Sequence, residues 1–451
     1  MKSKYITIIA LLSTLFTSTY AQPALSAWLQ NTTGTLSRHY VSGNSIPIQD
    51  NDSVNVQTVL YSSNWVYIRT KGQPSYVTGP FLDGNPSLAT NQNAIFKISL
   101  NPVQNTGNPT NTTPGNIGLF INGVALFDYR DGVSWQNATN SLKGGPLGGM
   151  GDQVWNRDAV VGERLGFDCS KGHPAMGNYH HHQNPSAFKL DLNVISTVCN
   201  LYDADGLYAI DSTTHSPLIG FASDGFPIYG AYAYKNVNGT GGIVRMKSSY
   251  NLRNIAVRNT DALGNPVTPG PPVNNTYPLG YFREDYEYIA TGPGTPDYLD
   301  EHNGRFCVTP EYPAGIYCYF ATVNDQWNSA YPYVVGPTFY GVKNATKVNS
   351  ITEPVTVYSP TETADFSKIL SNINVFPNPS NDILAIQLNN LNTQNVDVKL
   401  YEISGKLVNQ TTIFAGSTIA YFDTKTLYNG TYMLLIKNGK YQVSKKVTIN
   451  R

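Results

Sequence analysis

The sequence predicts a mainly β protein: a large loop-rich β domain followed by a small C-terminal β-sandwich of the immunoglobulin type. Tyrosine, glycine and proline are abundant, while charged residues make up only 13% of the chain, about half their usual share. This composition favours strands and turns over long helices. The 451 residues leave room for two or three domains, and a formal net charge of zero gives no basic field for nucleic acid.

The N-terminus has the pattern of a secretory signal peptide. Lys2 and Lys4 precede an apolar stretch at 6–16, and Ala21 ends a small-residue cleavage site. We expect residues 1–21 to be removed. The polar residues 22–49 are expected to form a weakly anchored extension. No later run approaches the ~20 apolar residues that span a bilayer, so we expect no transmembrane segment.

Alternating apolar and polar residues predict the strands of the large domain, which we assign to residues 50–342. The expected strands are 56–61, 65–69, 94–100, 117–121, 124–127, 218–222 and 226–230. Asn122-Gly123 suits a two-residue type I′ hairpin turn, and Asp224-Gly225 is the corresponding turn signal between the last two strands. Residues 235–276 are polar and rich in proline and glycine, which predicts a long rim loop.

The pattern changes near the C-terminus. A Thr/Ser/Glu/Pro-mixed stretch suggests a linker at 343–372. Short alternating strands then recur within 373–451, at 384–388, 396–401, 431–436 and 443–447. Strands of this length and spacing predict the small β-sandwich.

Histidines concentrate in one short segment. Four of the seven histidines of the chain lie between Gly172 and Pro185. The aromatic run Tyr179–His182, flanked by glycine and proline, favours a strand, and alternate residues of a strand face the same side. His180 and His182 would therefore point together, with His181 facing away, and His173 could fold back as a third ligand.

Three interpretations of this segment compete. Imidazoles converging with a carboxylate fit a divalent transition metal such as zinc or copper, of undetermined identity. The same histidines could instead form a structural hydrogen-bond network. A third interpretation is metal-free catalysis by one histidine. The predicted metal ligands are His173, His180, His182 and Asp168.

Other polar residues are second choices for the site. Asp224, Glu301 and His215 are candidate catalytic residues, as a general base or as partners that orient an imidazole. Asp224 also suits a tight turn, and Glu301 lies in the charged segment Asp300-Glu301-His302, where adjacent strand residues point apart. Both therefore also have a purely structural interpretation.

The four cysteines of an exported chain suggest two disulfides. Two strands flank the turn around Tyr312-Pro313, and centring the hairpin there places Cys307 opposite Cys318, close enough to bridge. Cys169 would then pair with Cys199 and brace the histidine segment. The alternative is that a cysteine thiolate binds metal.

The last segment resembles the type A C-terminal sorting domain of the type IX secretion system. The matching pieces are Val375-Phe376-Pro377-Asn378-Pro379-Ser380, 400–408, 427–432 and Lys445-Lys446-Val447. The resemblance implies recognition by the type IX machinery, and export across the outer membrane to the cell surface or medium. It also implies removal of the domain, with the remainder released or anchored to surface lipopolysaccharide.

The large domain resembles the YHYH-protein family. The resemblance is carried by Tyr179-His180-His181-His182, by 168–174, 215–230, 303–305 and 309–313, and by Tyr331-Pro332-Tyr333. One departure is that His181 stands where the family has its second tyrosine. The resemblance supports the domain and its residues but implies no activity.

Three functions remain open from the sequence. The first is an exported metal-binding protein, with a metalloenzyme as one form of it. The second is an adhesion or glycan-binding module, because exposed tyrosine and tryptophan rings stack on sugars, although most such rings pack in cores. The third is a secreted hydrolase, for which no Gly-x-Ser-x-Gly elbow is present.

Overall fold

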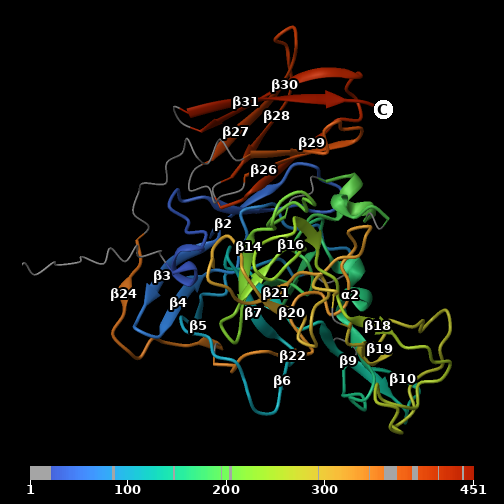
Figure 1. Ribbon diagram of the computed structural model, residues 1–451. Helices are drawn as coiled ribbons and strands as arrows, with labels where there is room; N and C mark the ends of the chain where they lie inside the picture. Colours follow the sequence, from blue (N-terminus) through green and yellow to red (C-terminus); the bar gives the residue numbers. More distant parts are fainter. Residues whose placement is uncertain are drawn as a thin grey trace, which may run out of the picture.

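The computed structural model describes residues 22–83, 87–145, 148–193, 196–202, 206–292, 294–344, 346–359, 373–388, 395–414, 416–438 and 441–451. The segment expected to be a signal peptide lies outside these ranges. The described chain is mainly β, as predicted, and forms a large central domain with a smaller domain above it (Figure 1). None of its helices is long and apolar enough to cross a membrane.

An eight-stranded sheet is the centre of the large domain. Its order is β12-β13-β8-β7-β14-β15-β21-β20. The bounds are β7 (Asn116–Phe120), β8 (Ala125–Phe127), β12 (Gly172–Ala175), β13 (Asn178–His181), β14 (Leu218–Ala222), β15 (Pro227–Tyr229), β20 (Gly304–Cys307) and β21 (Ile316–Phe320). Neighbours pair antiparallel except β13 with β8 and β15 with β21, which are parallel.

This sheet consists of two equivalent halves related by an approximate two-fold axis. In each half a first hairpin (β7-β8 or β14-β15) pairs in parallel with a second hairpin (β12-β13 or β20-β21). The axis passes between the central strands, where Phe221 pairs with Leu119, Gly220 with Phe120 and Ala222 with Gly118. The second hairpins match residue for residue, because His173 faces His180 as Arg305 faces Cys318.

The turns of the two first hairpins are also equivalent. Gly123 donates its N–H to Phe120 O at 2.8 Å, and Gly225 donates to Ala222 O at 2.9 Å. The two glycines have φ of 77° and 90°, whereas Asn122 is not among the residues with positive φ. The hairpin at 116–127 is therefore confirmed, but its turn is not type I′, which needs positive φ at both central residues.

A second sheet packs against the first through a shared apolar core. Its order is β23-β5-β4-β3-β24, with β3 (Val56–Tyr61), β4 (Trp65–Thr70), β5 (Ala94–Ser99), β23 (Thr346–Val348) and β24 (Thr356–Val357). Val59, Ile68 and Ile98 of this sheet join Leu119 and Phe221 in one cluster. The outer strands β23 and β24 come from the expected linker.

The N-terminal extension is anchored, contrary to the sequence-based expectation. Helix α1 (Pro23–Ser26) leads to Trp28 and Leu29, which are 4% and 3% exposed and belong to the main core. Leu29 N donates to Ile121 O, and Val56 N donates to Leu29 O. The composition of 22–49 hid this anchor because two large apolar side chains are enough to dock a polar segment.

Smaller elements surround these sheets (Figure 1). They are β1 (Leu36–His39), β2 (Ile48–Ser53), β6 (Thr110–Asn111), β9 (Arg130–Gln136), β10 (Ser141–Gly144), β11 (Asn156–Asp158), α2 (Ala159–Gly162), η2 (Arg164–Gly166), η3 (Phe188–Leu190), η4 (Thr197–Asn200), β16 (Tyr232–Tyr234), β17 (Ile243–Arg245), β18 (Tyr250–Leu252), η5 (Arg283–Asp285), β19 (Tyr286–Tyr288) and β22 (Thr338–Phe339). The helix α2 and the segment after it lie beside the histidine hairpin.

The C-terminal domain is a small β-sandwich, as predicted. Three strands, β25 (Ile373–Phe376), β26 (Ile383–Leu388) and β29 (Ile419–Asp423), form one sheet. Four strands, β27 (Val396–Glu402), β28 (Leu407–Ile413), β30 (Gly430–Asn438) and β31 (Tyr441–Ile449), form the other. Their inner faces share one apolar core.

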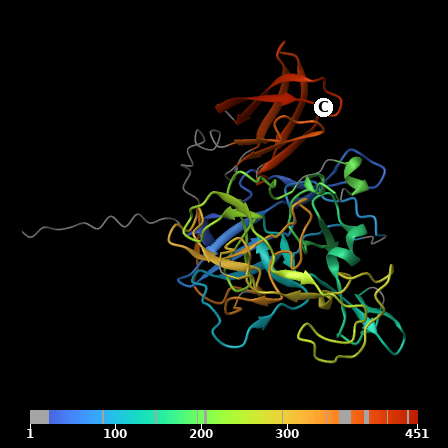
Figure 2. The same ribbon diagram turned by 45° about the vertical axis from the view of Figure 1, so that its right-hand side comes forward.

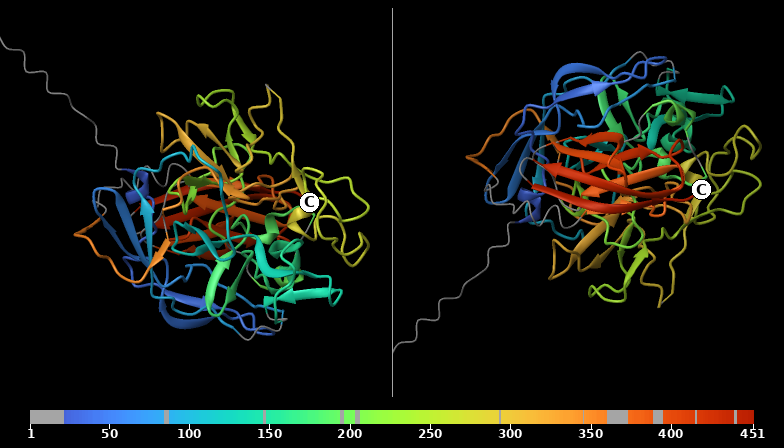
Figure 3. Two further views of the ribbon diagram at one scale, coloured as in Figure 1. Left: turned by 90° about the horizontal axis from the view of Figure 1, so that it is seen from below. Right: turned by 90° about the horizontal axis from the view of Figure 1, so that it is seen from above.

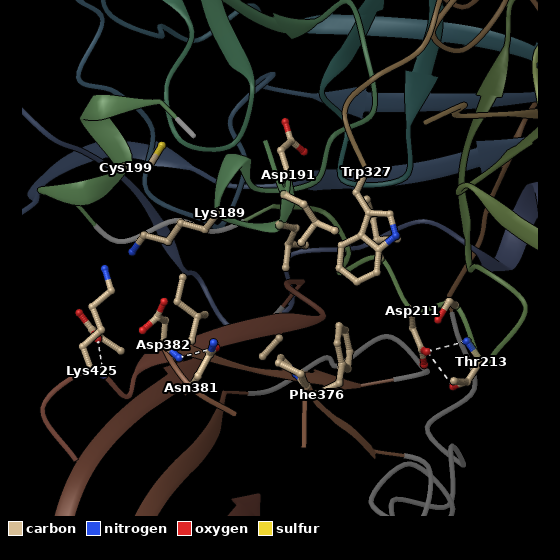
Figure 4. A pocket seen from close by; sticks show the side chains of 18 residues that line it. Lys189, Asp191, Cys199, Asp211, Thr213, Trp327, Phe376, Asn381, Asp382 and Lys425 are labelled. Carbon is tan, nitrogen blue, oxygen red and sulfur yellow. Dashed lines mark hydrogen bonds between the residues drawn. The ribbon is translucent and has the colours of Figure 1, made fainter. Parts of the chain in front are cut away.

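The sandwich sits directly on the central domain (Figures 2 and 3). Thr418 Oγ1 donates to Leu207 O at 2.6 Å, and Asn374 Nδ2 donates to Asp211 Oδ2 at 3.1 Å. A cavity of about 560 Å³ lies at the seam, with Trp327 of the central domain on one wall and Phe376 of the sandwich on the other (Figure 4).

One of the two expected disulfides is present. Cys169 is bonded to Cys199 with Cα atoms 5.2 Å apart, whereas Cys307 and Cys318 are free thiols. The predicted hairpin register was wrong by two residues, because Cys307 faces Ile316 and Cys318 faces Arg305. The two thiols are therefore diagonal neighbours, and diagonal positions hold their Cβ atoms farther apart than a disulfide spans.

Candidate metal centre

The β12-β13 hairpin brings three histidines together. His173 and His180 are directly opposed across the two strands, and His182 follows β13 on the same face as His180. The three residues are between 1% and 5% exposed. Each offers a nitrogen within 4.8 Å of the other two. The predicted cluster of His173, His180 and His182 thus forms as the strand alternation implied.

The Nε2 atoms point at one another. His180 Nε2 lies 3.0 Å from His182 Nε2, and His173 Nε2 lies 3.4 Å from His182 Nε2. Two of the rings have their other nitrogen engaged: His182 Nδ1 lies 2.6 Å from Asp128 O, and His180 Nδ1 lies 2.8 Å from Asn178 O. A carbonyl only accepts, so each Nδ1 carries a proton and each Nε2 is free to bind a cation.

Glu163 lies beside the three histidines and was not predicted from the sequence. Its Oε2 lies 3.2 Å from His173 Nε2 and 3.1 Å from His182 Nε2. The residue caps the C-terminal end of α2, a helix of only four residues. A single glutamate in a short helical segment, ten residues before His173, has no periodicity that distinguishes it from a surface residue.

Charge and burial oppose each other in this cluster. Burial raises the pKa of Glu163, but hydrogen bonding to His173 and His182 outweighs burial and lowers it overall. Burial lowers the pKa of His182, yet Glu163 raises it above the ordinary value. Burial and then the positive charges of His182 and His173 hold the pKa of His180 far below its usual range. Glu163 is therefore a carboxylate that needs a cation beside it, and His180 is a neutral donor.

The donor spacings fit a tetrahedral metal. Zinc–nitrogen bonds of 2.0–2.1 Å at tetrahedral angles place ligand atoms about 3.3–3.4 Å apart. The separations among His173, His182 and Glu163, and that between His180 and His182, are 3.0 to 3.4 Å and close to this edge length. Three imidazoles and one carboxylate are ligands that zinc and copper accept.

Aromatic rings enclose the histidines. Phe127 stacks on His180 with ring centroids 4.0 Å apart, and Phe167 meets His173 edge-on at 5.0 Å. These apolar rings pack against the imidazoles, and His173, His180 and His182 are at most 5% exposed. Glu163, with 25% of its side chain exposed, is the member of the cluster that reaches solvent.

Asp168, predicted as a ligand, is a scaffold residue instead. Its carboxylate accepts hydrogen bonds from Gly79 N, Ser170 N, Gly172 N and Tyr179 Oη. Burial raises its pKa to about 7. Tyr179 projects from the face of β13 opposite to His180, so Asp168 lies on the other side of the strand from the histidine cluster.

The second half of the sheet repeats this scaffold. Asp300 accepts from His302 N, Gly304 N and Tyr317 Oη in the same pattern. Because this aspartate–tyrosine motif occurs in both halves, its role is to hold the hairpin in place. By contrast, the residues at the positions of His173, His180 and His182 are Arg305, Cys318 and Phe320, so the histidines belong to one half alone.

The remaining candidates also lie elsewhere. Asp224 accepts from Tyr319 Oη at 2.6 Å and Gly341 N at 2.8 Å, and burial raises its pKa to about 6. The side chain of Glu301 is 54% exposed. His215 packs against the Tyr229 ring, with its Nδ1 2.7 Å from Ser216 O. Among the described residues, none of these three joins the histidine cluster.

His181 takes a structural position, as expected from its side of the strand. Its Nε2 lies 2.7 Å from Tyr76 Oη, and burial lowers its pKa to about 3. The equivalent residue of the second half is Tyr319. A histidine in place of the family's tyrosine does not alter the face of β13 that carries His180 and His182, because the His181 ring points away from that face.

Comparison with protein families agrees with this organisation. Residues 374–450 match the secretion system C-terminal sorting domain, which indicates export to the cell surface or extracellular space by the type IX machinery. None of the curated proteins matches the chain. Residues 95–333, more than half of the sequence, match the family described as YHYH protein. They include both halves of the eight-stranded sheet and every histidine of the cluster, and the chain therefore belongs to the YHYH protein family.

Proposed function

We propose that the protein is an exported metal-binding protein that holds one zinc or copper ion between His173, His180, His182 and Glu163. One observation carries the proposal: two buried imidazoles, each with its Nδ1 proton held by a backbone carbonyl, bring their Nε2 atoms to 3.0 Å of each other. Two bare lone pairs at this distance would repel each other, so the two Nε2 atoms share a cation, either the proton of a cationic His182 or a metal ion. A carboxylate beside the same nitrogens supplies balancing negative charge.

The chemistry of the site depends on Glu163. With four protein ligands the coordination is closed, which suits structural stabilisation or sequestration. Release of the partly exposed Glu163 would open one position to water or substrate, as in hydrolytic and redox centres. His173, His180 and His182 are held by strand pairing and aromatic packing, so they would stay in place while Glu163 moves.

Elemental analysis of the full chain tests the proposal. The protein is produced without a histidine tag in an oxidising compartment, purified without chelator, and compared with the His180→Ala/His182→Ala double variant. We expect about one equivalent of zinc or copper in the parent and its loss in the double variant. His302→Ala, which removes a histidine outside the cluster, is the matched control and should keep the metal.

Two results would count against the proposal. One is a folded parent that remains metal-free after incubation with zinc and copper salts. The other is a double variant that retains the parent's metal content. Circular dichroism and melting curves establish that each variant is folded, so that loss of metal is not confused with loss of structure.

A further inference from the structure

The two-fold axis of the central sheet relates the histidine cluster to a second buried polar cluster. At the position of His180 stands Cys318, opposite Arg305 on the neighbouring strand. Cys307, two residues farther along β20, is also fully buried. Tyr229 takes the place of Phe127, the ring that stacks on His180. The second half thus has a sulfur at one of the three histidine positions, and its other thiol, Cys307, lies at the position of Ala175.

The two thiols are neighbours without being placed for a disulfide. Cys318 Sγ donates to Ile316 O at 3.5 Å. Contact with Cys318, together with the charge of Arg305, lowers the pKa of the Cys307 thiol to about 7 in spite of burial. Their diagonal register places the Cβ atoms farther apart than the roughly 3.5–4.5 Å of a disulfide. A metal ion bonded to both sulfurs tolerates a wider separation than an S–S bond does.

The surroundings act on the two thiols in opposite directions. Burial, contact with Cys307 and the charge of Glu311 hold the pKa of Cys318 well above its usual range. Arg305, which is 8% exposed and donates to Lys235 O at 3.0 Å, lies beside Cys307 and supplies a positive charge. Its guanidinium charge is permanent. One cation beside two thiolates and a monovalent metal ion makes the cluster neutral overall.

The number of available ligands indicates which metal the two cysteines would bind. Among the described residues, no third histidine, cysteine or carboxylate has a ligand atom close enough to Cys307 and Cys318 to complete a three-ligand site. Zinc requires four ligands, whereas copper(I) is soft, prefers thiolates and accepts two. We infer that Cys307 and Cys318 form a second, independent metal site that binds copper(I) through two thiolates, with Arg305 balancing the charge.

Binding is a ligand exchange without electron transfer. Each thiol loses its proton to solvent and its sulfur donates an electron pair to copper(I). Two thiols and one Cu⁺ thus give one bis-thiolate complex of charge −1 and two protons. This inference does not depend on the histidine cluster, because the two sites share no residue.

Anaerobic titration of the full chain with copper(I), against a chromogenic copper(I) chelator, tests the inference. The starting material is the His180→Ala/His182→Ala variant, in which the histidine site is removed. We expect one equivalent of copper(I) bound, and at least a hundredfold weaker binding after Cys307→Ser or Cys318→Ser. Arg305→Met should weaken binding about tenfold, and X-ray absorption should show two sulfur neighbours.

Each possible result decides the question. Thiol titration of the denatured, unreduced protein should find two free thiols; finding none would mean that the cysteines form a disulfide and would overturn the inference. Unchanged copper(I) affinity in both serine variants would overturn it as well. Cys318→Ala, which keeps a small apolar side chain in the core, guards against a folding defect of the serine variants and should also lose copper(I).

Discussion

Glu163 is the residue on which the chemistry of the histidine cluster depends. Its Oε2 lies within 3.2 Å of two imidazole nitrogens, while a quarter of its side chain is exposed. The histidines around it are almost fully buried. The negative charge that balances a bound cation therefore comes from Glu163, which is the most exposed residue of the cluster.

Replacing this carboxylate should weaken metal binding without abolishing it. We expect Glu163→Gln to lower zinc affinity by about 10- to 100-fold, the range seen when groups around a metal are altered, because glutamine keeps the shape but not the negative charge. Competition with a chromogenic zinc chelator measures the effect. Glu311→Gln removes a carboxylate that accepts from Tyr229 Oη in the second half and should leave zinc affinity unchanged; equal affinities in all three proteins would contradict the assignment.

Asp224 gives a pH prediction at the same scale. Burial raises its pKa to about 6, compared with about 3.9 in an unfolded chain. A raised pKa means that folding favours the protonated form, so the stabilisation is complete below pH ~3.9 and is lost as the pH rises through 6. Relative to Asp224→Asn, the parent should lose roughly 2–3 kcal/mol of unfolding free energy between pH 4 and pH 7.5. Urea denaturation at a series of pH values measures this difference, and parallel curves would refute it.

At the scale of elements, the hairpins β12-β13 and β20-β21 each require a glycine at the same position. A Cβ atom on Gly172 would come within 2.4 Å of Tyr179 Oη, and one on Gly304 would come equally close to Tyr317 Oη. These tyrosines donate to Asp168 and Asp300, which hold the hairpin bases. Each glycine therefore lets a tyrosine pass over the backbone to its carboxylate.

The two glycines should be equally intolerant of substitution. We expect Gly172→Ala and Gly304→Ala each to cost about 1–3 kcal/mol of stability, the usual effect of overpacking. Only Gly172→Ala should also weaken metal binding, because His173 is its neighbour. Chemical denaturation and zinc competition on both variants test this pair, and a metal defect in Gly304→Ala would argue against separate roles for the two halves.

Several elements were predictable from the sequence because their signal is local. Alternation located β3, β4 and β5, and it placed His180 and His182 on one face. What could not be predicted depends on long-range pairing: the approach of Glu163, the register of Cys307 against Cys318, and the scaffold role of Asp168. A signal for the last existed, since Gly118–Phe127 and Gly220–Tyr229 have similar patterns, as do Asp168-x-x-Lys-Gly and Asp300-x-x-Asn-Gly. That repeat shows that Asp168 has a counterpart, Asp300, in the second half, whereas the three histidines have none. It would have indicated a structural role for Asp168.

The whole molecule contains two main apolar cores, one in the central domain and one in the C-terminal sandwich. Among the described residues, the domains are joined by the hydrogen bonds from Thr418 to Leu207 and from Asn374 to Asp211, by the Arg38 guanidinium over the Phe414 ring, and by a small mixed cluster around Leu190 and Ile419. A seam of this kind, with a cavity in it, couples two domains weakly. The domains should therefore unfold as separate cooperative units.

Calorimetry of the full chain should resolve two transitions. Leu400 is fully buried in the sandwich core, and Leu400→Ala should destabilise its own domain by about 2–5 kcal/mol. We expect the transition of the sandwich to shift to lower temperature while that of the central domain stays in place. Bound zinc should raise only the latter. A single transition that moves as a whole in Leu400→Ala would show that the seam is stronger than its contacts indicate.

The partners that orient His180 and His182 are main-chain oxygens of Asn178 and Asp128. No side-chain replacement can delete a peptide carbonyl, so point substitutions at these two positions leave the acceptors in place as long as the strands keep their pairing. The orientation of His180 and His182 therefore depends on the path of the backbone and not on which side chains occupy positions 178 and 128. Such a site can keep its geometry when neighbouring residues are substituted. A search for the same site in related proteins should therefore compare the strand pairing and not the identity of the neighbouring residues.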